Sequence, residues 1–171
     1  MIYFVKGFII NSLTENIINI FYLDRDIEKC VQYHNDKHVV KMILEYVQLL
    51  SSVHHVTGTA NHTCYKLTHQ NHPCAVWARS STENYLYLYS LAYALGQEYT
   101  YRYNKIHRSI YMMEDMPDPS GVKDGPFTDP PICTHDDFKH MEIVSAYRAY
   151  YMRDKHDFCV WTRREKPEWF I

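Results

Sequence analysis

Apolar residues recur at helical spacing along most of this chain, and the pattern predicts a mainly helical protein. The clearest case is the stretch 36–54, where Val39, Met42, Ile43, Val47 and Leu50 would line one face of an amphipathic helix. Further helices are predicted over about 26–34, over 75–95 with a continuation over 97–112 past a candidate break at Gly96, and over 137–152.

Other stretches depart from helical spacing. Residues 17–23 are β-branched and aromatic, which is typical of a strand. Residues 56–74 and 113–135 have the polar, proline-containing composition of loops. We therefore predict an all-α fold with at most one short strand near 17–23, organised as an N-terminal extension (1–16) and a single helical domain (17–171).

Composition agrees with one core and argues against a membrane. The hydrophobic fraction is 46%, enough to bury a core in a chain of 171 residues. No apolar run approaches the roughly 20 residues of a membrane helix, and the apolar opening lacks the basic leader of a signal peptide. Five cysteines without a Cys-x-x-Cys pair fit free thiols, so we expect an intracellular protein without a membrane partner.

The charge balance leaves the partner open. A formal net charge of −2 does not indicate a nucleic-acid binder, although a local basic face can occur on a neutral domain. The 16 tyrosines would serve either helix packing or base stacking, and their helical spacing favours packing.

The polar face of the helix predicted over 36–54 carries the strongest candidate chemistry. His34, His38, Lys41 and Glu45 follow at i, i+4, i+7 and i+11, so they share one face beside an apolar one. Ionisable groups at the edge of a core acquire shifted pKa values, which suits acid–base catalysis. The alternative is a solvated face with a Lys41–Glu45 ion pair.

Candidate ligand contacts follow in the later helices. Arg79 and Asn84 would contact an anion and a base, and Arg102 and His107 would form a phosphate-binding edge. The alternative for Arg102 is an ordinary helical ion pair with Glu98. His72, at a helix entry, could face a ligand.

Histidines and cysteines also gather between residues 62 and 74. Their spacings match no standard closed zinc site. We therefore predict no metal site and no cofactor from this loop, whose residues of this type are His62, Cys64, His69, His72 and Cys74.

Several segments together resemble a family of small uncharacterised proteins of phages and large viruses. The resemblance covers about residues 17–171 and places the protein in the cytoplasm or nucleus of an infected host cell. It does not indicate an activity. The matching segments are 19–24, 36–42, 71–79, 98–103 and 167–170.

A more remote resemblance is to the pyrimidine-dimer DNA glycosylases of the phage endonuclease V type. Those small helical enzymes carry an Asp-x-His-x6-Glu pattern, which Asp36, His38 and Glu45 match. The resemblance implies a catalytic role for Glu45 and a DNA contact for His38. That family attacks the sugar with its N-terminal amine, whereas this chain begins Met1-Ile2, so Lys41 is our candidate nucleophile.

These observations give three functional hypotheses. The first is a viral DNA-repair enzyme that resembles a base-excision glycosylase with AP-lyase activity. Catalysis would use Glu45, Lys41 and His38, and the substrate-binding residues would be Asp36, His72, Arg79, Asn84, Arg102 and His107. The second is a metal-dependent nucleotide hydrolase that uses His34, His38, His72 and Glu45. The third is a non-catalytic protein that binds a host factor or a signalling nucleotide.

Overall fold

The structure is a computed structural model that describes residues 18–171; the predicted extension over 1–16 lies outside them, as does residue 17. The described part is helical and contains no strand, which confirms the all-α prediction. Its α-helices are α1 (Ile27–Tyr33), α2 (Asp36–Thr57), α3 (Pro73–Ala78), α4 (Thr82–Tyr103), α5 (Arg108–Glu114) and α6 (Ile143–Tyr150). A 3₁₀ turn (Asp136–Phe138) precedes α6, and a π-helical turn (Tyr151–Lys155) and another 3₁₀ turn (His156–Phe158) follow it.

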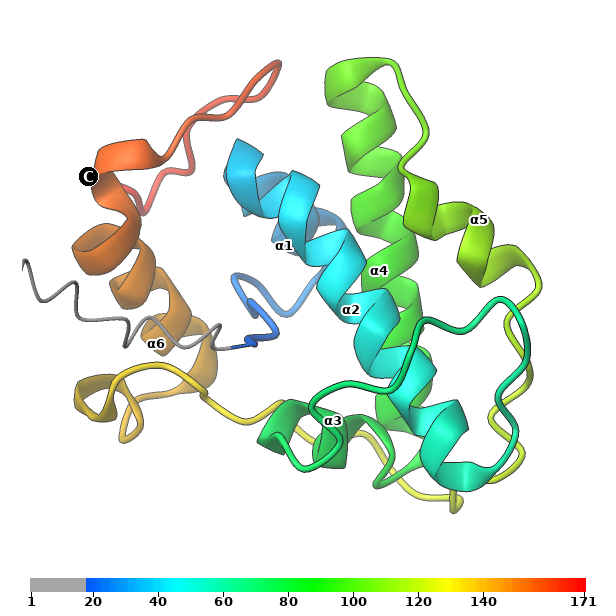
Figure 1. Cartoon of the computed structure of the whole chain (residues 1–171). Helices are drawn as coiled ribbons and strands as arrows, with labels where there is room; N and C mark the ends of the chain where they lie inside the picture. Colours follow the sequence, from blue (N-terminus) through cyan, green and yellow to red (C-terminus); the bar gives the residue numbers. More distant parts are fainter. Residues whose placement is uncertain (1–17) are drawn as a thin grey trace, which may run out of the picture.

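The two long helices, α2 and α4, pack against each other at the centre of the molecule (Figure 1). Helices α1, α3 and α5 pack around this pair, while α6 stands on the other side of the segment that precedes α1. Both central helices have side-chain N-caps, since Asn35 accepts from His38 N and Ser81 accepts from Asn84 N. No helix in the described part is long and apolar enough to cross a bilayer.

The segment 18–23 is not a strand, and the strand interpretation is therefore wrong for these residues. Its apolar side chains are buried beside α2 and α6, and Phe21 N donates to Tyr46 Oη on α2 (3.1 Å). Residues 18–171 contain no strand that could pair with this segment. Its β-branched and aromatic composition is therefore explained by burial.

Three predicted helix boundaries are also wrong. The chain bends between α3 and α4, where Ser81 begins the second helix, so the predicted helix over 75–95 is two helices. Gly96 does not break α4, and lies inside it instead. The predicted last helix begins later, after Glu142, whose side chain accepts from Ser145 N and caps α6.

Candidate functional site

Lys41 and Glu45 form an ion pair on the face of α2 where the sequence predicted acid–base chemistry. Lys41 Nζ lies 3.1 Å from Glu45 Oε1. The two side chains differ in environment, because that of Glu45 is 11% exposed and that of Lys41 is 56% exposed. Burial raises the pKa of Glu45, and the hydrogen bond from Lys41 opposes the rise. A desolvated carboxyl beside an exposed cation has the properties of a general acid or base.

The start of α3 and the loop before it contribute to the same neighbourhood. The positive charge of His69 lowers the pKa of Glu45, and the Glu45 carboxylate contributes to the raised pKa of the Cys74 thiol. Helix α3 packs directly on α2, so these groups meet at the junction of the two helices. Of the predicted ligand-binding residues, His72 lies in this neighbourhood.

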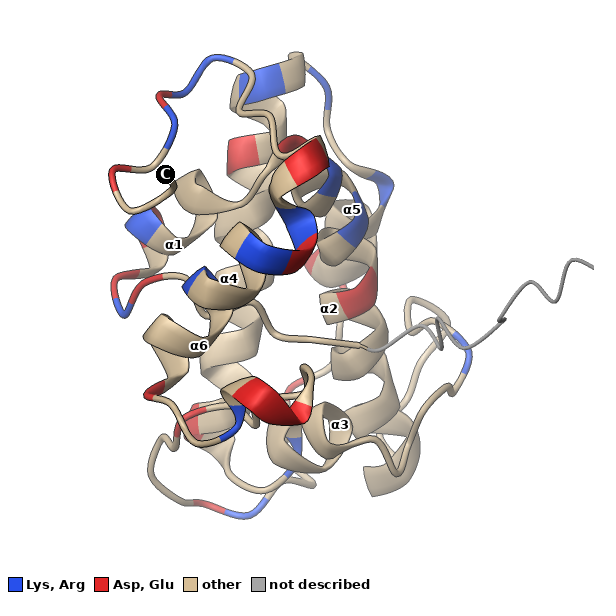
Figure 2. Ribbon diagram, turned by 90° about the vertical axis from the view of Figure 1, so that its left-hand side faces the viewer, with Lys and Arg blue, Asp and Glu red and all other residues tan. Residues whose placement is uncertain are grey.

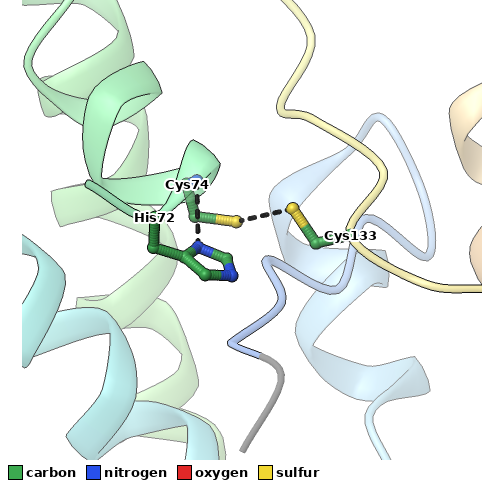
Figure 3. A group of neighbouring side chains, drawn as sticks. All are labelled: His72, Cys74 and Cys133. Carbon is green, nitrogen blue, oxygen red and sulfur yellow. Dashed lines mark hydrogen bonds between the residues drawn. The ribbon is translucent and has the colours of Figure 1, made fainter. Parts of the chain in front are cut away.

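His72 begins α3 and is the side-chain cap of that helix. Its Nδ1 accepts a hydrogen bond from Cys74 N at 3.2 Å, and Pro73 occupies the first turn. Burial lowers the pKa of His72, with a smaller effect from His69. Because Nδ1 accepts this bond, the neutral ring carries its proton on Nε2, and the lone pair that could bind a ligand is the one on Nδ1 (Figure 3).

Two thiols lie next to this imidazole, although their residues are far apart in sequence. Cys74 Sγ is 3.6 Å from Cys133 Sγ, which comes from the loop before the first 3₁₀ turn (Figure 3). The hydrogen bond between them raises the pKa of Cys74, as does burial, and lowers that of Cys133. One nitrogen of His72 and the two sulfur atoms all lie within 4.8 Å of one another.

His38 lies in the core rather than beside Glu45. Its Nδ1 is 2.6 Å from Tyr151 Oη, and its ring stacks on Phe21 with centroids 4.2 Å apart. Burial lowers its pKa well below the usual value. His34 is also buried, and its ring nitrogens contact Cys30 O and Tyr46 Oη. The structure therefore does not assemble the predicted ligand set of His34, His38, His72 and Glu45.

Arg102 and Asp36 belong to a buried ionic network. The Arg102 side chain is 0% exposed, and its nitrogens contact Glu98 Oε1 (2.7 Å), Asp36 Oδ1 (2.9 Å) and Gln32 O (2.9 Å). Asp36 also accepts from Thr162 in the C-terminal tail. These groups saturate one another, so their arrangement serves packing rather than phosphate binding. The alternative interpretation of Arg102 as the helical partner of Glu98 matches this geometry.

The three remaining candidates hold loop and helix ends in place. Asn84 is buried and bonds to both the backbone and the side chain of Thr128. Arg79 Nη1 donates to Gln70 O at 2.6 Å. His107 caps α5 by accepting from Ser109 N at 3.2 Å. Of the nine predicted site residues, only Lys41, Glu45 and His72 gather where α2 meets α3.

Comparison with known proteins adds no relative. No family model matches this chain, and no curated protein or solved structure matches it either. The two resemblances drawn from sequence segments therefore stay predictions, and the functional argument depends on the site geometry.

Proposed function

We propose that this chain is a DNA-processing enzyme of the base-excision type that uses Glu45 as its acid–base group. The observation that carries the proposal is the desolvated Glu45 carboxyl, paired at 3.1 Å with the exposed ammonium of Lys41. Burial raises the pKa of Glu45 and so brings its titration closer to neutral pH, where an acid–base catalyst works best.

Lys41 contributes a cation at the surface of this site. Lysine nucleophiles that attack a sugar carbon are activated in desolvated pockets, whereas the Lys41 side chain is 56% exposed. We therefore assign Lys41 to holding a phosphate beside Glu45, with Schiff-base formation as the alternative that borohydride trapping tests.

The charge distribution restricts how DNA would bind. Lysine and arginine positions are interspersed with aspartate and glutamate positions over the face drawn in Figure 2. Binding would therefore depend on a few local contacts rather than on a broad basic surface, and it would have a shallow dependence on salt.

Oligonucleotides with damaged or modified pyrimidines test the proposal. We expect base release or strand cleavage by the wild type, and a loss of roughly 100-fold or more in Glu45→Gln. The stability of the variant should change by no more than about 1–2 kcal/mol. Glu165→Gln is the matched control, because Glu165 is an exposed glutamate in the C-terminal tail.

Two outcomes would contradict the proposal. The first is full activity in Glu45→Gln, which would remove Glu45 from the mechanism. The second is the absence of any reaction with the whole oligonucleotide panel, which would leave a binding protein as the better interpretation. Covalent trapping of the wild type by borohydride, lost in Lys41→Ala, would return Lys41 to the role of nucleophile.

A further inference from the structure

The geometry points to a zinc-type metal site formed by His72, Cys74 and Cys133. One nitrogen and two sulfur atoms from these residues lie within 4.8 Å of one another (Figure 3). Two of the ligands come from the start of α3, and the third comes from a loop 59 residues later in the chain. This inference goes beyond the proposed function, because metal binding does not depend on an action on DNA.

The sulfur separation suits a shared metal ion. Zinc–thiolate bonds of about 2.3 Å in a tetrahedral arrangement hold two sulfur atoms roughly 3.8 Å apart. Cys74 Sγ and Cys133 Sγ are 3.6 Å apart, so they could bind one ion with almost no movement. The half-buried His72 ring supplies the third ligand atom, which lies within 4.8 Å of both sulfur atoms.

The surroundings position the ligand atoms. His72 Nδ1 accepts from the Cys74 backbone N–H, so its lone pair is directed toward the start of α3, and a metal ion would bind Nδ1 in place of this capping bond. Cys74 is fully buried, with its Sγ 3.7 Å from Ile18 O. Cys133 N donates to Tyr147 Oη at 3.4 Å. All three ligands are thus attached to packed parts of the fold.

The donor set determines the class of metal. Thiolates are soft ligands that select Zn²⁺ and similar ions, whereas Mg²⁺ and Ca²⁺ require oxygen ligands. Two thiolates and one imidazole also balance the charge of a divalent cation closely. We therefore assign the site to Zn²⁺, with Co²⁺ as a spectroscopic substitute.

Three protein ligands leave one position of a tetrahedral ion for solvent. Closed structural zinc sites use four protein ligands, and catalytic sites use three with a water molecule. His72 and Cys133 are half-buried, so solvent can reach the group.

Cobalt titration of the full-length, fully reduced protein under nitrogen tests the site. We expect one equivalent of Co²⁺ to produce sulfur-to-cobalt charge-transfer absorption and the intense visible bands of tetrahedral coordination, both removed by one equivalent of Zn²⁺. Cys133→Ser should abolish the charge-transfer band or weaken it at least twofold, and His72→Gln should change the visible bands. Cys64→Ser is the matched control, because this half-buried thiol in the preceding loop instead lies near Asn61.

Circular dichroism and thermal melting establish that each variant is folded. A folded, reduced wild type that takes up neither Co²⁺ nor Zn²⁺ would overturn the proposal. Equal binding by the wild type and by both Cys133→Ser and His72→Gln would also overturn it. These readouts are independent of DNA cleavage, so the failure of the metal site and the failure of the proposed function are distinguishable.

Discussion

At the scale of single residues, the buried histidine His34 illustrates how the core constrains ionisation. Burial lowers the pKa of His34 to about 4, although its hydrogen bond to Cys30 O opposes the change. The ring is therefore neutral at pH 7, with Nδ1–H donating to Cys30 O and Nε2 accepting from Tyr46 Oη. Such a neutral, fully bonded histidine stabilises the core only while it remains unprotonated.

The pKa of His34 leads to a prediction about acid stability. The unfolded chain binds a proton below about pH 6.5, whereas folded His34 binds one only near pH 4. The contribution of neutral His34 to the free energy of unfolding should therefore be fully present above pH 6.5. It should be lost as the pH decreases to 4, and the loss should reach up to about 3 kcal/mol. Urea unfolding between pH 7.5 and 4.5 measures this.

The control for His34 is a glutamine at the same position. His34→Gln retains a donor and an acceptor but does not titrate, so its free energy of unfolding should fall less steeply over this range. Part of the slope should persist, because burial lowers the pKa of His38 in the same direction. Identical slopes for the wild type and His34→Gln would show that His34 does not contribute.

Sequence spacing predicted local residue pairs and missed distant ones. The Lys41–Glu45 and Glu98–Arg102 pairs are both i, i+4, and both are present in the structure. The Arg102–Asp36 pair joins residues 66 positions apart, so no helical period could indicate it. The burial of Arg102 depends on that long-range contact, so the sequence could not show that Arg102 is buried. For this reason Arg102 was predicted to bind phosphate.

At the scale of helices, Gly96 shows that a glycine inside a helix can serve packing. It lies on α4 where α5 crosses, and a Cβ atom there would come within 2.6 Å of Ile110 Cγ1. From the sequence, Gly96 is a candidate break, because glycine in a helix interior costs about 1 kcal/mol relative to alanine. The close approach of α5 explains its position instead.

Gly96→Ala should therefore destabilise the protein despite the better helix propensity of alanine. We expect a net loss of about 1–3 kcal/mol, because overpacking displaces Ile110 in a well-packed contact. Ser90→Ala, at an exposed site on the same helix, should not be destabilising. Chemical denaturation measures both. A more stable Gly96→Ala protein would mean that α5 moves freely away from α4.

Other element boundaries were predictable to different degrees. The polar caps Asn35 and Glu142 are local signals that a sequence displays. The bend before Ser81 has no glycine or proline at 79–81 to mark it. It occurs where Arg79 ends α3 and its side chain donates to Gln70 O in the preceding loop. The segment 18–23 was misassigned because strands and buried irregular segments share the same apolar composition.

At the scale of the molecule, the candidate metal group depends on two segments that are distant in sequence and fold together. The sequence identified the face of α2 that carries Glu45 and the histidine and cysteine residues before α3. It could not identify Cys133, because metal-ligand spacing rules apply to ligands that are near in sequence. Tertiary packing of the loop before α6 against α3 supplies this thiol.

The C-terminal tail extends from the α6 side of the fold to the end of α1 and the C-terminal part of α4. Trp161 Nε1 donates to Tyr33 O at the end of α1 (2.9 Å), and Arg164 pairs with Glu98 on α4 (2.8 Å). Phe170 is buried, with 5% of its surface exposed, whereas the adjacent Ile171 is 88% exposed. The tail thus contributes apolar burial and also completes the ionic network around Arg102.

Removal of residues 161–171 should therefore unfold or strongly weaken the protein. Burial of each aromatic side chain stabilises by about 1.5–3 kcal/mol, and the loss of Trp161 and Phe170 together approaches the total stability of a small domain, about 5–15 kcal/mol. The single change Phe170→Ala should cost about 3–5 kcal/mol.

Deletion of Ile171 alone is the control and should change the free energy of unfolding by less than about 0.5 kcal/mol. Urea denaturation followed by tryptophan fluorescence measures the point variant and the Ile171 deletion, and far-ultraviolet circular dichroism follows the longer truncation. Equal stability of Phe170→Ala and the wild type would show that the tail lies on the fold without stabilising it.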